Sequence, residues 1–386
     1  MKFNEYDKIK TPDLSNRQYI PIYNNNINNK RIRSYYIFSF TFSLILIILF
    51  LYYIRNTKTI KVTLSRKSID LDKNEKYFLI KLKSILEVDE LFENEMMSKH
   101  TTFKLGGPAR YFAKPKSINK IIQVIKLCKE YSIDYFILGN GSNLLVSDKG
   151  YDGLIINIHE SNFSNLEQIK VNDTIYKINV GGGILMRTLA QKLCLLSLSG
   201  LEDIIDIPGT IGGGIIMNAD AGGKGFIRDS LEKVKVITPD GDIKELTKDE
   251  CELGIKGSLL KNKKYMVIEA TFTLKKDDKL IIQKRMANHT SQRYARQPMY
   301  FPSAGCFFVW VKPKFGSLYE RYKESNLIGY KVGDAMVYTH NIAFIVNLGN
   351  AKSSDVYEIV THIENIMNKK YQIEIRREVV VLGSFS

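Results

Sequence analysis

Three glycine-dense stretches constrain the fold of this chain more than any other feature. They are residues 139–143 (Gly-Asn-Gly-Ser-Asn), 181–183 (three glycines) and 208–214 (Pro-Gly-Thr-Ile-Gly-Gly-Gly). Glycine lets the main chain approach a pyrophosphate closely, and successive N–H groups form an anion-binding nest. None of the stretches has the spacing of a dinucleotide-binding G-x-G-x-x-G motif or of a P-loop. A single stretch of this kind is more often a tight turn. Two of them in neighbouring subdomains predict a dinucleotide-binding site between them.

The elements predicted around these stretches are typical of an α+β fold. The sequence predicts a helix capped by Ser117, a strand–turn–strand over residues 134–148 and a hairpin at Asp240-Gly241. It also predicts a helix around 75–86, a basic helix over 280–297, a helix over 353–368 and a C-terminal strand near 378–385. No internal repeat is present. We expect two packed subdomains followed by a third.

The N-terminal part of the chain has a different character. Residues 1–34 are polar and rich in asparagine, a composition that cannot bury enough apolar surface to fold alone. Residues 35–54 form a run of twenty residues without a charge, long enough to cross the roughly 30 Å hydrocarbon core as a helix. This pattern predicts a single-pass membrane anchor. Its orientation stays open, because basic residues flank both ends of the run.

Charge and cysteine content argue against several classes of partner. The formal charge is +15, and residues 1–70 carry twelve Lys or Arg against four Asp or Glu. The later basic residues are dispersed, whereas nucleic-acid binding needs them clustered with aromatic residues on one face. The four cysteines lie far apart, with no C-x-x-C pair and no histidine at metal-ligand spacing. We expect no nucleic-acid partner, no metal and no disulfide framework, and unpaired cysteines favour a non-oxidising compartment.

These observations set the expected domain boundaries. The predicted parts are a polar tail (1–34), a transmembrane helix (35–54), a stalk (55–95), a cofactor-binding region of two subdomains (96–278) and a C-terminal substrate domain (279–386).

Five segments carry a specific resemblance to a known family. They are "TTFKLGGPARYF", "LGNGSNLLVSDKG", "IPGTIGGGIIMNA", "RYARQPMYFPSAGCFF" and "EIRREVVVLG". In this order they resemble bacterial UDP-N-acetylenolpyruvoylglucosamine reductases, in particular the shorter subtype, from about Met97 to Gly383. The resemblance implies a vanillyl-alcohol-oxidase (PCMH) type FAD-binding fold in two subdomains, with an α+β substrate domain. It implies that non-covalent FAD passes a hydride from NADPH to the enolpyruvyl ether of UDP-N-acetylglucosamine, which gives the peptidoglycan precursor UDP-N-acetylmuramate.

The resemblance also implies which residues hold FAD. Two loops correspond to those that contact the cofactor in the family, one around its pyrophosphate and one over the flavin. The implied residues are Gly139, Asn140, Gly141, Ser142 and Asn143 in the first loop, and Gly209, Thr210, Gly212 and Gly213 in the second.

The reaction requires a proton donor and a cation near the substrate's carboxylate. The cation stabilises negative charge that develops after hydride addition, and the donor protonates the adjacent carbon. The resemblance implies that Cys306 is the proton donor and that Glu378 assists it, and it places Lys256 as the cation. Taken alone, Cys306 is more often a packed side chain and Glu378 a surface residue of a strand. Within the motif we favour the catalytic interpretation.

The sequence departs from the family at positions that serve the substrate. Lys256 stands in an arginine position and keeps the charge without the planar, bidentate fork, and Ile255 stands in a tyrosine position. The tyrosine of the family's Gly-Ala-Tyr-Gly is Gly222 in "DAGG", Val309 replaces an expected lysine, and His340 is displaced by one position.

Three hypotheses for the function follow. The first is the membrane-anchored reductase of the family, acting on a sugar nucleotide. The second is a flavin oxidoreductase with another substrate, because a fold hosts many chemistries. The third is a flavin-binding protein without turnover.

Overall fold

The structure is a computed structural model, and it describes residues 73–158, 163–220, 225–309 and 317–385. The chain divides into two units, residues 1–72 and 73–386, and the description below concerns the second. The polar tail and the predicted membrane span, residues 35–54, lie outside the described residues. Within the described ranges, no helix has both the length and the apolar character needed to cross a bilayer.

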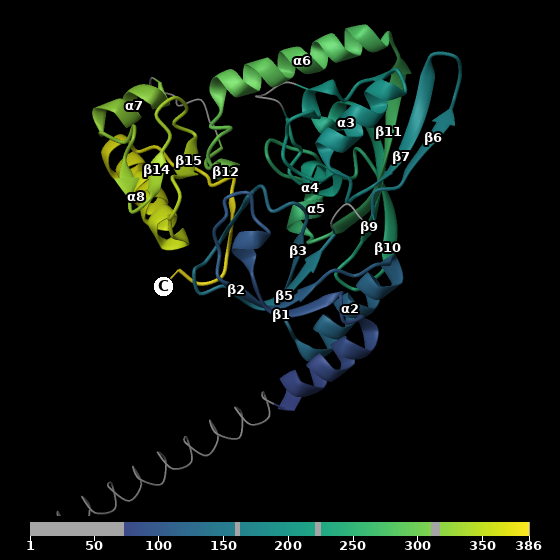
Figure 1. Cartoon of the computed structure of the whole chain (residues 1–386), viewed down its shortest axis with the longest axis horizontal. Coiled ribbons are helices and arrows are strands. Elements are labelled where there is room, and N and C mark those ends of the chain that lie inside the picture. The colour runs from purple at the N-terminus through teal and green to yellow at the C-terminus, as the bar shows by residue number, and fades with distance from the viewer. Residues whose placement is uncertain (1–72, 159–162, 221–224, 310–316, 386) are drawn as a thin grey trace, which may run out of the picture. The chain divides into compact units, whose positions relative to one another are not determined.

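The first subdomain is built on a four-stranded sheet (Figure 1). Its strands, in spatial order, are β1 (Leu91–Met96), β2 (Pro108–Ala113), β5 (Tyr151–Asn157) and β3 (Tyr135–Leu138). Strands β2 and β3 both run parallel to β5, and α2 (Ile118–Tyr131) connects them. Ser117 caps α2 by accepting a hydrogen bond from the N–H of Lys120, as the sequence predicts.

A helix over residues 73–85 belongs to the core of this subdomain. Phe78, Leu82 and Leu86 are buried and pack with α2 and the sheet. The ring of Phe78 lies 5.5 Å from the ring of Tyr111. Helix 73–85 and β1 are therefore part of the folded domain, although the sequence assigns them to the stalk (55–95). Apolar residues four positions apart form one buried stripe, but the many charged residues around them make this pattern hard to recognise in the sequence.

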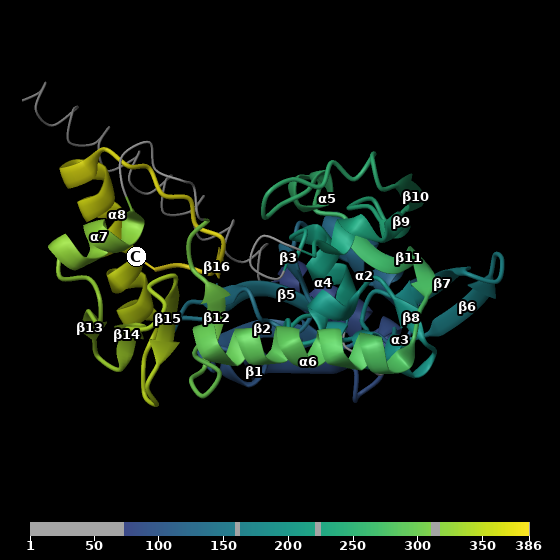
Figure 2. The same ribbon diagram turned by 90° about the horizontal axis from the view of Figure 1, so that it is seen from above.

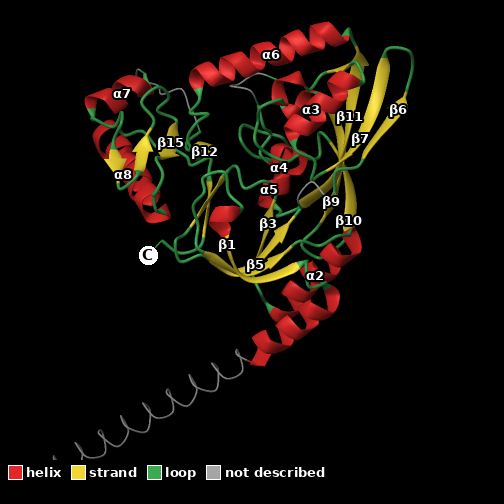
Figure 3. Cartoon of the chain, viewed as in Figure 1, coloured by secondary structure: helices red, strands yellow, loops and turns green. Residues whose placement is uncertain are grey.

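The second subdomain is built on a larger sheet. Its main path, in spatial order, is β10 (Ile243–Thr247), β9 (Leu231–Ile237), β11 (Met266–Lys276), β7 (Ile175–Gly181) and β6 (Leu166–Lys170), and β8 (Leu198–Ser199) pairs with β11. Helices α3 (Met186–Leu195) and α4 (Ile211–Ile216) lie beside β7 and β11 and share one buried core with them (Figure 3). The predicted hairpin at Asp240-Gly241 is confirmed, since β9 pairs with β10 and Gly241 has φ +80°.

The third glycine-dense stretch, residues 208–214, is partly helical and not a loop throughout. Thr210 is the N-cap of α4 and accepts a hydrogen bond from the N–H of Gly213. A Cβ on Gly212 would lie 3.1 Å from the carbonyl oxygens of Gly182 and Val267. The glycines thus let a short helix pack directly against the main chain of the sheet, which outweighs their low helix propensity.

The C-terminal domain contains a four-stranded sheet covered by helices. Its elements are β12 (Ser303–Cys306), β15 (Phe344–Asn347), β14 (Ala335–Val337), β13 (Lys331–Val332), α7 (Leu318–Glu324) and α8 (Ser353–Tyr371). The long basic helix α6 (Lys279–Arg296) runs along the second subdomain from the side of α3 toward β12 (Figure 2). Both helices predicted here, over 280–297 and 353–368, are confirmed.

The last strand returns to the first subdomain. Strand β16 (Val380–Leu382) pairs in parallel with β4 (Leu144–Val146), with Val380 opposite Leu144. Strand β4 directly follows the glycine turn 139–143. The chain end therefore lies beside the turn that the sequence assigns to FAD.

Candidate functional site

The turn 139–143, between β3 and β4, is held by hydrogen bonds to its carbonyl groups. The carbonyl of Gly139 accepts a hydrogen bond of 2.9 Å from the Asn157 side chain, and that of Gly141 accepts one of 3.2 Å from the N–H of Thr102. Gly141 has φ +63°, and a Cβ on it would lie 2.1 Å from the carbonyl oxygen of His100. Only glycine fits this position, so the turn is preorganised before any ligand arrives.

The third glycine-dense stretch, residues 208–214, contacts this turn directly. The side chain of Asn140 donates a hydrogen bond of 3.2 Å to the carbonyl of Pro208. A Cβ on Gly139 would lie 2.5 Å from Oγ1 of Thr210, and one on Gly209 would lie 3.4 Å from Oγ of Ser142. The structure therefore brings together residues that the sequence predicts separately, from both subdomains.

Three of the predicted cofactor residues have structural roles in this region. The N–H of Gly212 donates to the carbonyl of Gly182 at 2.8 Å, and the N–H of Gly213 donates to the Thr210 side chain. Asn143 connects to the C-terminal segment, because its side chain donates to the carbonyl of Glu378 at 3.2 Å. Gly212 and Gly213 thus use their N–H groups inside the protein.

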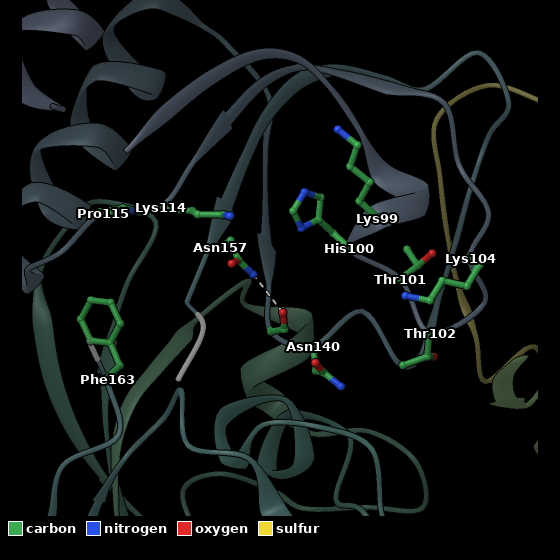
Figure 4. A pocket seen from close by; sticks show the side chains of 11 residues that line it. Lys99, His100, Thr101, Thr102, Lys104, Lys114, Pro115, Asn140, Asn157 and Phe163 are labelled. Atoms are coloured by element: carbon green, nitrogen blue, oxygen red, sulfur yellow. Dashed lines mark hydrogen bonds between the residues drawn. The ribbon is translucent and has the colours of Figure 1, made fainter. Parts of the chain in front are cut away.

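A cavity of about 510 Å³ opens beside the first glycine turn. Gly139, Asn140 and Asn157 line it together with basic side chains, which are Lys99, His100, Lys104 and Lys114. In Figure 4, Lys104 and Lys114 point from opposite sides into the space near Asn140 and Asn157. A glycine-lined turn facing ammonium groups is suited to a pyrophosphate.

The structure also brings the three predicted catalytic residues into one cluster. Cys306 ends β12, and Glu378 lies just before β16. Lys256 lies in the turn between β10 and α5 (Leu259–Asn262). The ammonium Nζ of Lys256 lies 3.3 Å from Oε1 of Glu378. The electrostatic interactions of the half-buried Cys306 thiol include both of these groups.

Burial sets the protonation states in this cluster. Burial raises the pKa of Cys306 to about 12, with a further increase from Glu378 and an opposing effect of Lys256. Burial also raises the pKa of Glu378, against the effect of Lys256. Burial disfavours the charged form of Lys256, but Glu378 and Asp220 outweigh it and raise the pKa of Lys256. At neutral pH the thiol holds its proton more firmly than a free cysteine, whose pKa is about 8.5, and the lysine is charged.

Two charged residues in the cluster are missing from the sequence prediction. The carboxylate Oδ2 of Asp220 lies 2.7 Å from Nζ of Lys256 and is almost fully buried. Arg293, from α6, acts on the Cys306 thiol and opposes the increase of its pKa. Arg293 lies in the quoted segment "RYARQP" and Asp220 in "DAGG". Their motifs are visible in the sequence, but their proximity to Cys306 is not.

The positions at which the sequence departs from the family differ in their surroundings. Ile255 is 70% exposed, and its carbonyl accepts a hydrogen bond of 3.0 Å from Arg376. Val309 is buried, and His340 is exposed and contacts the Thr339 hydroxyl at 3.0 Å. Gly222 lies outside the described residues.

Comparison with known proteins agrees with this arrangement. The description of an FAD binding domain matches residues 109–247, and that of the UDP-N-acetylenolpyruvoylglucosamine reductase C-terminal domain matches residues 297–382. The reductase of Agathobacter rectalis is 36% identical over 302 residues, which are 76% of this chain and 95% of the relative. That of Clostridium novyi is 36% identical over 320 residues, 83% of this chain and 99% of the relative.

The chain belongs to the UDP-N-acetylenolpyruvoylglucosamine reductase family.

A solved structure supports this family assignment at the level of the fold. The UDP-N-acetylenolpyruvylglucosamine reductase (MurB) of Thermus caldophilus matches with a TM-score of 0.60 and 29% identity, over 75% of this chain and 98% of that one. The fold is thus the PCMH-type FAD-binding fold with the family's C-terminal domain, and the cofactor is FAD. The first glycine turn, which has no room for a Cβ at Gly141, and the lysines of the cavity fit its pyrophosphate.

Proposed function

We propose that this chain is the FAD-dependent, NADPH-using reductase of the enolpyruvyl ether of UDP-N-acetylglucosamine, which forms UDP-N-acetylmuramate for peptidoglycan synthesis. The observation that carries the proposal is the cluster of Lys256, Glu378 and Cys306. A cation, a carboxylate and a protonated thiol lie together, and they belong to three segments distant in sequence. These are the groups that the reduction of an enolpyruvyl ether requires.

The reduction adds a hydride and a proton across the carbon–carbon double bond. FAD, which the glycine turn 139–143 and the cavity lysines would hold, would provide the hydride chemistry, with NADPH as the reductant. We assign the substrate's carboxylate to Lys256, whose charge stabilises the negative charge that develops there. The Cys306 thiol holds a proton at Sγ and donates it to the adjacent carbon, and the thiolate left behind must be reprotonated before the next turnover. Lys256 and Arg293 stabilise that thiolate, since both favour the charged form of Cys306.

The position of Glu378 suits an assisting role. Its N–H donates a hydrogen bond of 2.9 Å to the carbonyl of Phe307, the residue after Cys306. Its raised pKa makes it a reservoir for a proton beside the thiol. We assign to Glu378 the return of the proton to Cys306 after each turnover.

We further propose that residues 35–54 anchor the enzyme in a membrane by a single span. The support is the charge-free length of this segment. The expected result is that the full-length chain stays with membranes during carbonate extraction. Recovery in the soluble fraction would contradict the anchor.

A flavin oxidoreductase with a different substrate is the second candidate. The observation that favours it is the replacement of the family's arginine by Lys256 and of its tyrosine by the exposed Ile255. A lysine binds a carboxylate as a point charge and not as a bidentate fork.

One experiment separates the candidates. Full-length protein with FAD is mixed anaerobically with NADPH and then with the enolpyruvyl sugar nucleotide, while the flavin absorbance is recorded. The proposed reductase loses the absorbance and regains it with the sugar nucleotide, and the product gains two hydrogens by mass. Loss without recovery favours the second candidate. No loss at all indicates flavin binding without turnover.

A further inference from the structure

Two other segments of the chain form hydrogen bonds to the turn that contains Lys256. On one side, the side chain of the buried Asn218 donates a hydrogen bond of 2.7 Å to the carbonyl of Gly254. On the other side, Arg376 donates one of 3.0 Å to the carbonyl of Ile255. The turn closes on itself, because the N–H of Gly254 donates to the carbonyl of Gly257 at 3.0 Å. Two partner segments thus fix its main chain next to the predicted catalytic cluster.

The same two segments hold the Lys256 ammonium. Nζ lies 2.7 Å from Oδ2 of Asp220, two residues after Asn218, and 3.3 Å from Oε1 of Glu378, two residues after Arg376. One ammonium therefore bridges two carboxylates. Lys256 itself has φ +56°, a left-handed conformation that is strained for a lysine and recurs at functional sites.

Burial of the Asp220 carboxylate lowers the stability of the fold. Its side chain is only 4% exposed, and a buried carboxylate lowers stability unless partners compensate for the lost hydration. The family motif quoted above, Gly-Ala-Tyr-Gly, has glycine at this position. A glycine carries no such cost, so a role in stability alone does not account for Asp220.

Asp220 compensates for the flexibility of the Lys256 side chain. An arginine has a planar fork that is preorganised for a carboxylate, whereas a lysine carries its charge at the end of a flexible four-carbon stem. An anionic partner at 2.7 Å restricts that stem and directs the ammonium toward Glu378 and Cys306. Both departures from the family, Lys256 and Asp220, then form a single adaptation.

We propose that Asp220 is a positioning residue of the substrate site, which holds the Lys256 ammonium between Glu378 and Cys306. This inference rests on the proposed function. Its electrostatic consequence involves the neighbouring charged groups of the cluster. Lys256, Asp220 and Lys261 act on Glu378, and Glu378, Lys256, Arg293 and Asp220 act on the Cys306 thiol. The charge of Asp220 contributes to the raised pKa of both Glu378 and Cys306, and so favours the protonated form of each.

The first test measures reoxidation of NADPH-reduced, full-length protein by the enolpyruvyl sugar nucleotide. In Asp220→Asn we expect kcat to fall about tenfold while KM stays equal or decreases, because the site has lost one negative charge near an anionic substrate. Asp240→Asn is the matched control. It removes another Asp–Lys ion pair, with Lys129, which is exposed and outside the cluster. An increase of KM with unchanged kcat would show that Asp220 does not position a reacting group.

A double-mutant cycle tests whether the two departures form one adaptation. Asp220→Gly leaves the lysine without its anchor, and Lys256→Arg places a larger guanidinium against the carboxylate. Each single variant should lose about tenfold or more in kcat, and the double variant should recover most of the loss. If the kcat loss of the double variant equals the product of the two single losses, the proposal is overturned.

Alkylation of Cys306 by iodoacetamide provides a readout that needs no turnover. The other cysteines are buried, so Cys306 is the accessible thiol among those described, and Cys306→Ser gives the background. In Asp220→Asn the rate at about pH 9 should rise several-fold, because an anion near the thiol is gone. An unchanged rate in a variant with the wild-type melting temperature would refute the effect of Asp220 on the cluster. If wild type is not reoxidised by the sugar nucleotide, the proposed function fails, while alkylation still tests Asp220.

Discussion

The main-chain N–H of Glu378 donates a hydrogen bond of 2.9 Å to the carbonyl of Phe307. This bond joins the segment before the last strand to the residue that follows Cys306. The carbonyl of Glu378 in turn accepts a hydrogen bond of 3.2 Å from the Asn143 side chain in the first glycine turn. Glu378 is therefore held between the cofactor turn and the thiol that we assign as proton donor.

The first prediction concerns the glycine turn. Gly141→Ala should weaken FAD binding at least tenfold, since its methyl group would lie 2.1 Å from the carbonyl oxygen of His100 at a φ of +63°. The FAD dissociation constant, from flavin fluorescence, is the measurement. Gly257→Ala is the control, because a Cβ there meets no atom within 4 Å. A folded Gly141→Ala protein with normal FAD affinity would argue against the assignment of this turn.

The second prediction concerns the beginning of the folded domain. Deletion of residues 1–60 should leave FAD binding intact, whereas deletion of residues 1–89 should lower the melting temperature strongly. The longer deletion removes the buried Phe78, Leu82 and Leu86, each worth about 1.5–3 kcal/mol of hydrophobic burial. Thermal unfolding with and without FAD measures the difference. Equal melting temperatures of the two truncated proteins would show that helix 73–85 is dispensable.

The third prediction concerns stability at alkaline pH. Burial raises the pKa of Cys306 to about 12, so the folded protein keeps a proton that the unfolded chain releases above about pH 9. Because the unfolded state then binds fewer protons, stability is complete below that pH and falls as the pH rises toward 12. Cys306→Ser should lose less stability than wild type between about pH 8 and 10.5. Cys128 and Cys251 are present in both proteins and cancel in the comparison. Equal slopes of melting temperature against pH would contradict the raised pKa of Cys306.

Local patterns predict much of the fold. The Ser117 cap, the Asp240-Gly241 hairpin and the basic helix α6 each depend on residues close in sequence, and all are confirmed. The helix predicted around 75–86 is also present, over residues 73–85, but its place in the folded core is not predicted, because its buried stripe is short and surrounded by charges. The helical form of residues 211–216 is also not predictable from propensity, because it depends on packing against the main chain of Gly182.

Site residues that belong to a sequence motif are predictable. Contacts between charged residues that are distant in the sequence are not. Lys256, Glu378 and Cys306 are found from their motifs, although no local pattern shows that Lys256 approaches Glu378. Asp220 is missed because its neighbour in space is 36 positions away in the sequence. The basic cavity side chains, such as Lys104 and Lys114, are likewise brought together only by the fold.

The fourth prediction tests the central claim, that Cys306 donates the proton. In stopped-flow experiments, Cys306→Ala should lose flavin absorbance with NADPH at nearly the wild-type rate, because this step does not need the proton of the thiol. Its reoxidation by the enolpyruvyl sugar nucleotide should slow by about two orders of magnitude or more, the usual scale for a positioned proton donor. Cys306→Ser should retain much of the activity, because a hydroxyl also donates.

The rate of reoxidation of Cys306→Ala, measured beside wild type in the same experiment, is the most direct test of this account. If Cys306 donates the proton, reduction by NADPH is normal and the step that consumes the sugar nucleotide slows by about a hundredfold or more. A Cys306→Ala protein that reoxidises at the wild-type rate would contradict it and would leave Cys306 as a packed side chain.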